Sequence, residues 1–358
     1  MHVTFPAVGG ILLRSFIILS LTLCMHFGTV FAQELVKASL RDDRPLSNEL
    51  SDVARAFPDS TPTDLSPTAP LRVVFPTGTI PDDLHGPTIG PIKKGRIYLV
   101  GGAMLAGNTA IMYYYYKTFY SPRQSERSSW HVFNDWYNAD LNVDKIGHIW
   151  GTQAYANTLY HLFRWTNMRE EPAMWWSSGL ALFFQTEMEM TDAFYKAWGW
   201  SWWDVGANVI GAAYPNLQRA WPPLSSVCLK MSYRPSRLIT QKWVDYVLKD
   251  YDGFTFWLAL TVEDVLPAGL KRFWPDWLGI AVGYGAANTV IAKNTYNTDR
   301  NNIGLGDQEW YIALDYDLRR LPGDSPLLKF LKEELNLLHF PSPAIRITPS
   351  AVFYGFFF

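Results

Sequence analysis

The sequence predicts an α+β protein in which a four-helix core precedes a C-terminal antiparallel sheet of about five or six strands. Two observations lead to this fold class. Long apolar stretches fill the range 93–223, whereas short segments that alternate apolar and polar residues occur in the range 224–358. A helix repeats every 3.6 residues and a strand every two, so these patterns indicate helices first and strands last.

Composition limits the partners that we expect. The chain has 358 residues, of which 18% are charged and 16% aromatic, and its formal net charge is −2. A protein that binds nucleic acid through its phosphates needs a basic excess, which this chain lacks. Its 16 tryptophans and 19 tyrosines suit a chain that meets lipid, because both side chains collect where apolar and wet regions join. We therefore expect membrane lipid or envelope proteins as partners, and no nucleic acid.

Residues 1–32 have the features of a secretory signal peptide. Arg14 is their only charged residue, the apolar run 16–23 follows it, and Ala32 provides a small residue before a cleavage point. The run is short for a membrane span, and an uncleaved anchor is the alternative. Cleavage would leave Cys228 as the last cysteine, which excludes an intrachain disulfide and a cysteine metal site.

Residues 33–92 are expected to form a Pro-rich tether that is largely extended or disordered. Nine prolines lie between Pro45 and Pro91. Proline removes a backbone donor and fixes φ, so this spacing prevents any long helix or central strand.

The helical core is expected to contain four helices. The first, Ile97–Tyr116, has no charged residue and is long enough to cross a bilayer. Its glycines and Asn108 lower its apolarity, so a buried helix of a soluble bundle is an equal alternative. The other three are expected at Lys145–Trp165, Ala173–Met190 and Trp202–Trp221.

Local signals mark the starts of the last three helices. Asp144 is a cap candidate for the first of them, and Ser201 is one for the third. Pro172 precedes the second, where its fixed φ suits a first turn.

The C-terminal region, 224–358, is expected to be mostly β and to pack on the core or lie at a membrane. The clearest alternating segments are Val227–Arg234, Gly279–Gly285, Trp310–Leu318 and Ala351–Phe358. Each presents one apolar face, as a half-buried strand does. Pro326–Leu338 is expected to be an amphipathic helix with its leucines on one side.

Polar residues inside the apolar helices are the candidates for a functional site. Asp144 and His148 are four residues apart and share one helix face, as do Asp204 and Asn208. Acidic residues also lie at the end of the helix expected at Ala173–Met190. The full candidate set is Asp144, Lys145, His148, Glu187, Asp192, Asp204 and Asn208.

These candidates admit three interpretations. An ionisable residue in an apolar helix costs free energy unless it is paired, so we expect a polar seam with Lys145 and Asp192 nearer its rim. The seam could be a satisfied structural network. It could also hold a metal, zinc or a harder cation, through His148, Glu187 and Asp204. It could finally serve general acid–base chemistry on a lipid-linked or phosphorylated substrate.

The ordered motifs resemble those of the YfiM-like family of predicted periplasmic lipoproteins, domain of unknown function family 2279. The motifs are Asp144-Lys145-x-Gly147-His148, then Glu187 to Asp192, then Gly199 to Asp204 followed by Asn208 and Gly211. The likeness extends over roughly 95–358. Shorter pieces are similar to VanZ-like membrane proteins.

The resemblance implies a bacterial envelope protein in the periplasm, associated with the outer membrane. It supplies no reaction and leaves the cofactor unknown, because the family has no established activity. The chain departs from the lipoprotein pattern at Cys24, since Leu23 stands where a lipidation site wants a small residue.

The sequence therefore predicts a membrane-associated structural or interaction component of the envelope. The alternative is an envelope enzyme or lipid-binding protein, metal-dependent or not, that acts through a His/Glu/Asp site.

Overall fold

The computed structural model describes residues 90–136, 138, 140–242, 247–289 and 306–358. The expected signal peptide, and the expected tether up to residue 89, lie outside the described residues. The described part falls into two units, 90–107 and 108–358, and the account below concerns the second unless stated otherwise.

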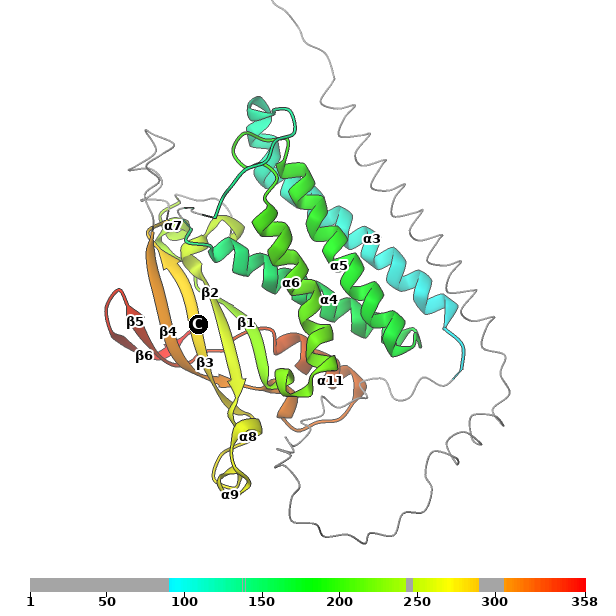
Figure 1. The fold of residues 1–358 in the computed structure, drawn as a ribbon, viewed down its shortest axis with the longest axis vertical. Helices are drawn as coiled ribbons and strands as arrows, with labels where there is room; N and C mark the ends of the chain where they lie inside the picture. Colours follow the sequence, from blue (N-terminus) through cyan, green and yellow to red (C-terminus); the bar gives the residue numbers. More distant parts are fainter. Residues whose placement is uncertain (1–89, 137, 139, 243–246, 290–305) are drawn as a thin grey trace, which may run out of the picture. The chain divides into compact units, whose positions relative to one another are not determined.

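Four long helices come first among the described residues (Figure 1). They are α3 (Lys94–Tyr115), α4 (Val143–Trp165), α5 (Glu170–Asp192) and α6 (Trp202–Ala220). Helices α4, α5 and α6 pack on one another. Within the described ranges, no helix combines the length and the apolarity that crossing a membrane requires.

The helix starts agree with the sequence signals at α6 and differ at α4 and α5. Ser201 caps α6, because its hydroxyl accepts the backbone N–H of Asp204. Asp144 lies in the first turn of α4 and not at its cap, a position where an acid still favours the helix dipole. α5 begins at Glu170, so Pro172 lies inside its first turn. The backbone N–H groups of a first turn have no acceptor within the helix, so a proline there removes no hydrogen bond.

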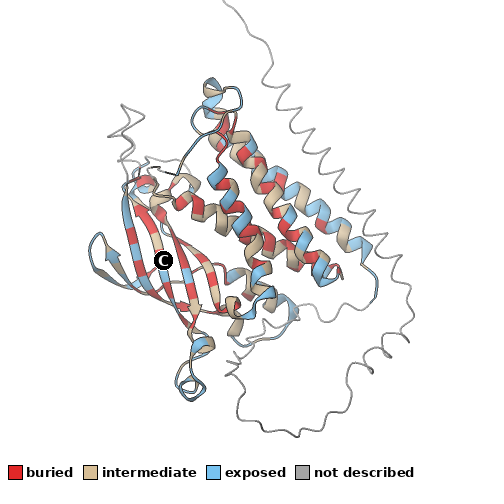
Figure 2. Cartoon of the chain, in the orientation of Figure 1, coloured by how far each residue is buried: buried red, intermediate tan, exposed pale blue. Residues whose placement is uncertain are grey.

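A six-stranded antiparallel sheet follows, so the α+β fold class is confirmed. Its strands are β1 (Val227–Tyr233), β2 (Phe254–Thr261), β3 (Leu278–Ala287), β4 (Asp307–Tyr316), β5 (Ser342–Thr348) and β6 (Val352–Phe357). Each strand pairs with its neighbours in sequence, in the order β1-β2-β3-β4-β5-β6. Buried and exposed residues alternate along most strands (Figure 2).

Short elements connect these parts. The short α-helices are α7 (Arg237–Thr240), α8 (Val262–Val265) and α9 (Ala268–Lys271), and α11 covers Pro326–Leu335. A π-helical turn covers Tyr116–Tyr120, and 3₁₀ turns cover Ser121–Glu126, Pro222–Ser226, Val247–Lys249, Tyr251–Gly253 and Leu318–Arg320.

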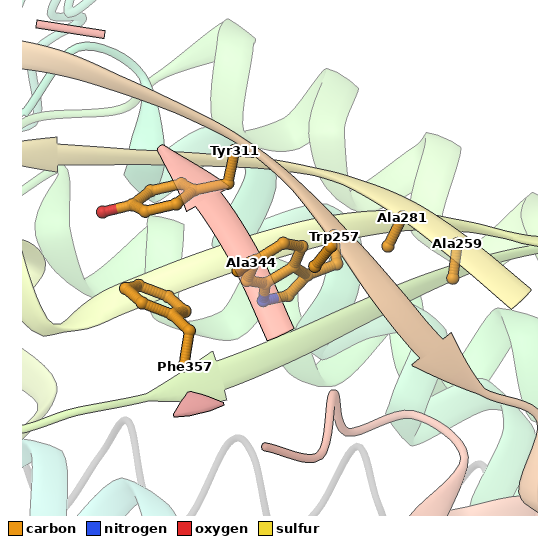
Figure 3. Close-up of a cluster of buried hydrophobic side chains, with 7 residues drawn as sticks. Trp257, Ala259, Ala281, Tyr311, Ala344 and Phe357 are labelled. Atoms are coloured by element: carbon orange, nitrogen blue, oxygen red, sulfur yellow. The ribbon is translucent and has the colours of Figure 1, made fainter. Parts of the chain in front are cut away.

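One face of the sheet, called the inner face here, carries a buried core. Its members are Trp257, Ala259, Ala281, Tyr311, Ala313, Ala344 and Phe357 (Figure 3). The alanines and Gly283 make room for Trp257, because a Cβ at Gly283 would come within 2.6 Å of the indole ring.

The segment after α11 covers this inner face. α11 ends at Leu335, and not at the expected Leu338, because residues 337–339 pair with Met231 of β1. The His339 ring stacks on Trp257 with ring centroids 4.0 Å apart before the chain enters β5, the partner of β4.

The opposite face, called the outer face, meets the helices at one corner. Val143 of α4 clusters with Phe256 and Ala286 there, and Tyr284 donates its hydroxyl to the Leu141 carbonyl at 2.6 Å. The helices and the sheet are thus joined through α4.

Candidate functional site

A polar cluster lies where α4, α5 and α6 meet, with Lys145 at its centre. Lys145 is only 5% exposed. Its Nζ lies 2.9 Å from Asp144 Oδ2 and 2.7 Å from Asp204 Oδ1, and it also donates to Asp135. Burial opposes the ammonium charge, but the three carboxylates outweigh it and raise the pKa of Lys145 above its usual value.

Hydrogen bonds from nearby side chains hold these carboxylates in place. Ser201 Oγ donates to Asp135 Oδ1 at 2.7 Å, and Asn138 Nδ2 donates to both oxygens of Asp144 at 3.1 and 3.2 Å. Burial would raise the pKa of Asp135, but the hydrogen bonds from Lys145 and Ser201 lower it below its usual value. The part of the cluster around Lys145 is therefore a paired ionic network.

His148 links all three helices on the other side of Asp204. Its Nδ1 lies 3.1 Å from Asn208 Oδ1 on α6, an oxygen that also lies 2.9 Å from Thr152 Oγ1. Its Nε2 lies 3.5 Å from Glu189 Oε1 on α5 and 3.7 Å from Asp204 Oδ1 on α6. The His148 side chain is 18% exposed, against 2% for Glu189, so histidine is the accessible member.

A glycine allows α6 to approach α4 this closely. A Cβ at Gly211 would lie 2.3 Å from the Ile149 carbonyl oxygen, a distance that no side chain tolerates. Gly211 is one turn from Asn208, so its small size lets the Asn208 amide reach His148 and Thr152.

Two acids of α5 hold their protons unusually strongly. Burial, together with the charges of Asp204 and Asp192, raises the pKa of Glu189 to about 10. Burial also raises the pKa of Asp192 to about 7, although the Tyr120 hydroxyl, which donates to it at 2.8 Å, opposes the shift. In this structure Glu189 is therefore a neutral acid at pH 7 and can donate a proton beside His148.

The structure brings most of the predicted candidates together. Asp144, Lys145, His148, Asp204 and Asn208 all contribute to the cluster. Lys145 was expected near the rim and is buried at the centre instead. Asp192 accepts a hydrogen bond from the Tyr120 hydroxyl. Glu187 lies against Asn108, whose Nδ2 donates to its Oε2 at 2.9 Å.

Sequence reasoning missed Glu189 and selected its neighbour Glu187. Residues two apart on a helix point about 200° apart, so the two side chains leave α5 on different sides. A signal did exist in the polar residues of α5. Ser178 donates to the Ala212 carbonyl of α6, and Gln185 and Glu189 follow it at helical spacing.

Two groups of side chains in the cluster are close enough to share a cation. Donor atoms of His148, Glu189 and Asp204 lie within 4.8 Å of one another, and so do those of Asp135, Asp144 and Asp204. The ammonium of Lys145 already contacts the second group.

A second unusual feature is an apolar row that crosses the outer face. Leu258, Val282, Ile312, Ile345 and Phe353 occupy successive partner positions on β2 to β6. Each of the five is between 48% and 69% exposed. Apolar side chains thus form a continuous line on the surface, where the alternation of a strand usually places polar residues.

Aromatic pairs stand on both sides of this row. Tyr284 and Trp310 are partners at one end of β3 and β4, with ring centroids 4.8 Å apart. Trp277 and Tyr316 lie at the other end, with centroids 6.0 Å apart. Tryptophan and tyrosine favour the boundary between an apolar layer and water.

Helix α11 also exposes its apolar side, called the leucine face here. Its leucines, between 39% and 68% exposed, are Leu327, Leu328, Leu331 and Leu335. Its polar side points inward instead. Lys332 is 9% exposed and donates to the carbonyls of Leu321 and Gly323, and Glu334 accepts from Thr158 at 2.7 Å.

Comparison with known proteins finds a family model that matches the part of the chain with the polar cluster. The model of a family described as "Predicted periplasmic lipoprotein (DUF2279)" matches residues 133–220, a range that contains every cluster residue from Asp135 to Asn208. No curated protein and no solved structure matches the chain. The match confirms the resemblance over residues 133–220 and fits an exported envelope protein. Residues 133–220 are therefore similar to a family of predicted periplasmic lipoproteins of unknown function.

Proposed function

We propose that this protein is a membrane-associated component of the bacterial envelope, and that its outer face contacts the acyl chains of lipid. The observation that carries this proposal is the apolar row of five half-exposed side chains on β2 to β6. The outer membrane is the bilayer that we expect, in agreement with the family resemblance.

Energetics support a role for the row. Soluble monomers rarely expose a continuous apolar patch larger than a few hundred Å². Covering a half-exposed side chain of this size is worth on the order of 1 kcal/mol, so the whole row offers roughly 5 kcal/mol. That is enough for reversible attachment to a surface, and the aromatic pairs on both sides of the row suit a lipid boundary.

The test is flotation of the purified full-length exported chain with phospholipid vesicles, after mass spectrometry has established whether Cys24 carries lipid. Ile312→Asp places a charge in the middle of the row and should reduce the bound fraction at least tenfold. Because Ile312 is 50% exposed, the fold should tolerate the change.

Two matched variants complete this experiment. Ile312→Val keeps the row apolar and should bind like the parent. Gln241→Glu adds the same single negative charge at an exposed position on another element and should also bind. If Ile312→Asp floats as well as the parent, lipid is not the partner of this face, and another envelope protein becomes the candidate.

A second candidate function is general acid–base catalysis at the polar cluster, on a lipid-linked or phosphorylated substrate. The observation that favours it is the neutral acid Glu189 beside the partly exposed His148. Replacement of His148 by Gln should abolish turnover of such a substrate while circular dichroism remains unchanged, and retained turnover would exclude this role.

A further inference from the structure

Three donor atoms from three helices converge at one point of the polar cluster. His148 Nε2 of α4 lies 3.5 Å from Glu189 Oε1 of α5 and 3.7 Å from Asp204 Oδ1 of α6. These distances are too long for good hydrogen bonds. Two ligands bound tetrahedrally to one ion at about 2.1 Å would lie about 3.4 Å apart. The spacing therefore suits an ion between the three atoms.

The orientation of the histidine ring suits the same arrangement. Asn208 Oδ1 lies 3.1 Å from His148 Nδ1. Because an amide oxygen accepts hydrogen bonds, this contact favours the tautomer with the proton on Nδ1. Nε2 then carries a lone pair that points towards two carboxyl groups. Histidines that bind metals commonly donate their second ring N–H to an oxygen in this way.

A buried carboxylate oxygen of Asp204 points into the same space. Asp204 is 6% exposed, and its Oδ1 receives no hydrogen bond of good geometry from the residues that the structure describes. The contacts of this oxygen are ionic, to Lys145 Nζ at 2.7 Å and to His148 Nε2 at 3.7 Å. This oxygen therefore lies between the Lys145 ammonium and the His148 ring, where it can share a cation with Nε2.

The charge of the cluster also favours a second cation. The carboxylates of Asp135, Asp144 and Asp204 surround a single ammonium group, that of Lys145. Buried carboxylates are costly unless cations balance them. Lys145 contacts Asp135, Asp144 and Asp204, so among the described residues one ammonium group balances three carboxylates.

We propose that His148, Glu189 and Asp204 form a binding site for a divalent first-row transition-metal ion, zinc or manganese, between α4, α5 and α6. One imidazole and two carboxylates make a ligand set of intermediate hardness, which these ions accept. The site goes beyond the proposed lipid contact, because the three ligands lie on the helices and the apolar row lies on the sheet.

The experiment is calorimetric titration of the chelator-treated full chain with zinc chloride and with manganese chloride. The parent should bind one ion in this cluster. Glu189→Gln and His148→Gln should each lower the affinity at least tenfold. Glu187→Gln is the matched control, since it makes the same change two residues away on α5, and it should bind like the parent.

Thermal melts with and without the metal keep the test decisive if one variant is unstable. The metal should raise the melting temperature of the parent and of Glu187→Gln, and not that of Glu189→Gln. Glu189→Gln should fold, because the amide keeps the size and shape of the carboxyl group. The proposal is overturned if the folded parent binds neither metal, or if Glu187→Gln and Glu189→Gln bind equally well.

Discussion

Glu187 and Glu189 stand two residues apart on α5 and have different partners. Glu187 Oε2 accepts a hydrogen bond from Asn108 Nδ2 at 2.9 Å, whereas Glu189 Oε1 lies 3.5 Å from His148 Nε2. The two acids have the same side chain and share one helix, so any difference between their variants reports the environment of the side chain. This pair is therefore the internal control for the chemistry of the cluster.

The first prediction concerns the pH dependence of stability without metal. The pKa of Glu189 is about 10 in the folded protein, above its ordinary value of 4.5. The folded state thus favours the protonated form. The resulting stabilisation is complete at pH values below the pKa of Glu189 in the unfolded chain. It is lost as the pH rises through the pKa of Glu189 in the folded protein. In chelator, the parent should lose up to about 1.4 kcal/mol per pH unit on this account.

Thermal melts between about pH 8 and pH 10 measure this loss. That window avoids Asp192, whose pKa is about 7. Glu189→Gln cannot titrate and should give a flatter curve, while Glu187→Gln should keep the slope of the parent. Equal slopes for the two variants would show that Glu189 is ionised in the folded protein.

The second prediction concerns the ammonium at the centre of the cluster. Lys145→Met removes the shared partner of Asp135, Asp144 and Asp204, and leaves buried carboxylates without compensation. The expected loss is about 3–5 kcal/mol in a urea titration. Lys329→Met is the control, since its partner Asp324 is 93% exposed and lies 3.7 Å away. That change should cost less than about 1 kcal/mol. Similar losses would mean that the Lys145 contacts add little.

The sequence predicted the fold class because its signals are local. Helical periodicity marks α4 to α6, and Ser201 caps α6 as a serine before an apolar run should. Strand β2 was not named, because Phe254–Thr261 is apolar on both sides and does not alternate. Its inner residue Trp257 is fully buried, whereas its neighbour Leu258 is 54% exposed. Because both residues are apolar, the sequence alone does not show which of them is buried.

The composition of the site was predictable, and its exact geometry was not. Spacing on one helix placed His148 four residues after Asp144, and Asn208 four residues after Asp204. The choice between Glu187 and Glu189 depends on which side of α5 meets its neighbours, a property of tertiary packing. Asp135 lies outside the long helices, and only the fold brings it to Lys145.

The third prediction compares two glycines of α6. A Cβ at Gly211 would lie 2.3 Å from the Ile149 carbonyl oxygen, so Gly211→Ala must push α4 and α6 apart. The expected cost is on the order of 2 kcal/mol. Gly206 has nothing within 4 Å of such a Cβ, and Gly206→Ala should stabilise the helix by up to about 1 kcal/mol. Urea titrations of both variants measure these changes. A stabilising Gly211→Ala would show that the two helices can separate without cost.

The last prediction concerns the leucine face of α11. Leu327 is 68% exposed and Leu331 is 42% exposed, so neither contributes much to the core. If this face also meets lipid, the double replacement Leu327→Asp and Leu331→Asp should lower vesicle binding severalfold and leave the melting temperature within a few degrees. Leu337, 6% exposed, is the opposite case, and Leu337→Ala should cost about 2–5 kcal/mol. Flotation and thermal melts of the same samples separate the two effects. A double variant that floats normally but melts far below the parent would place the leucine face in the core, with no part in lipid contact.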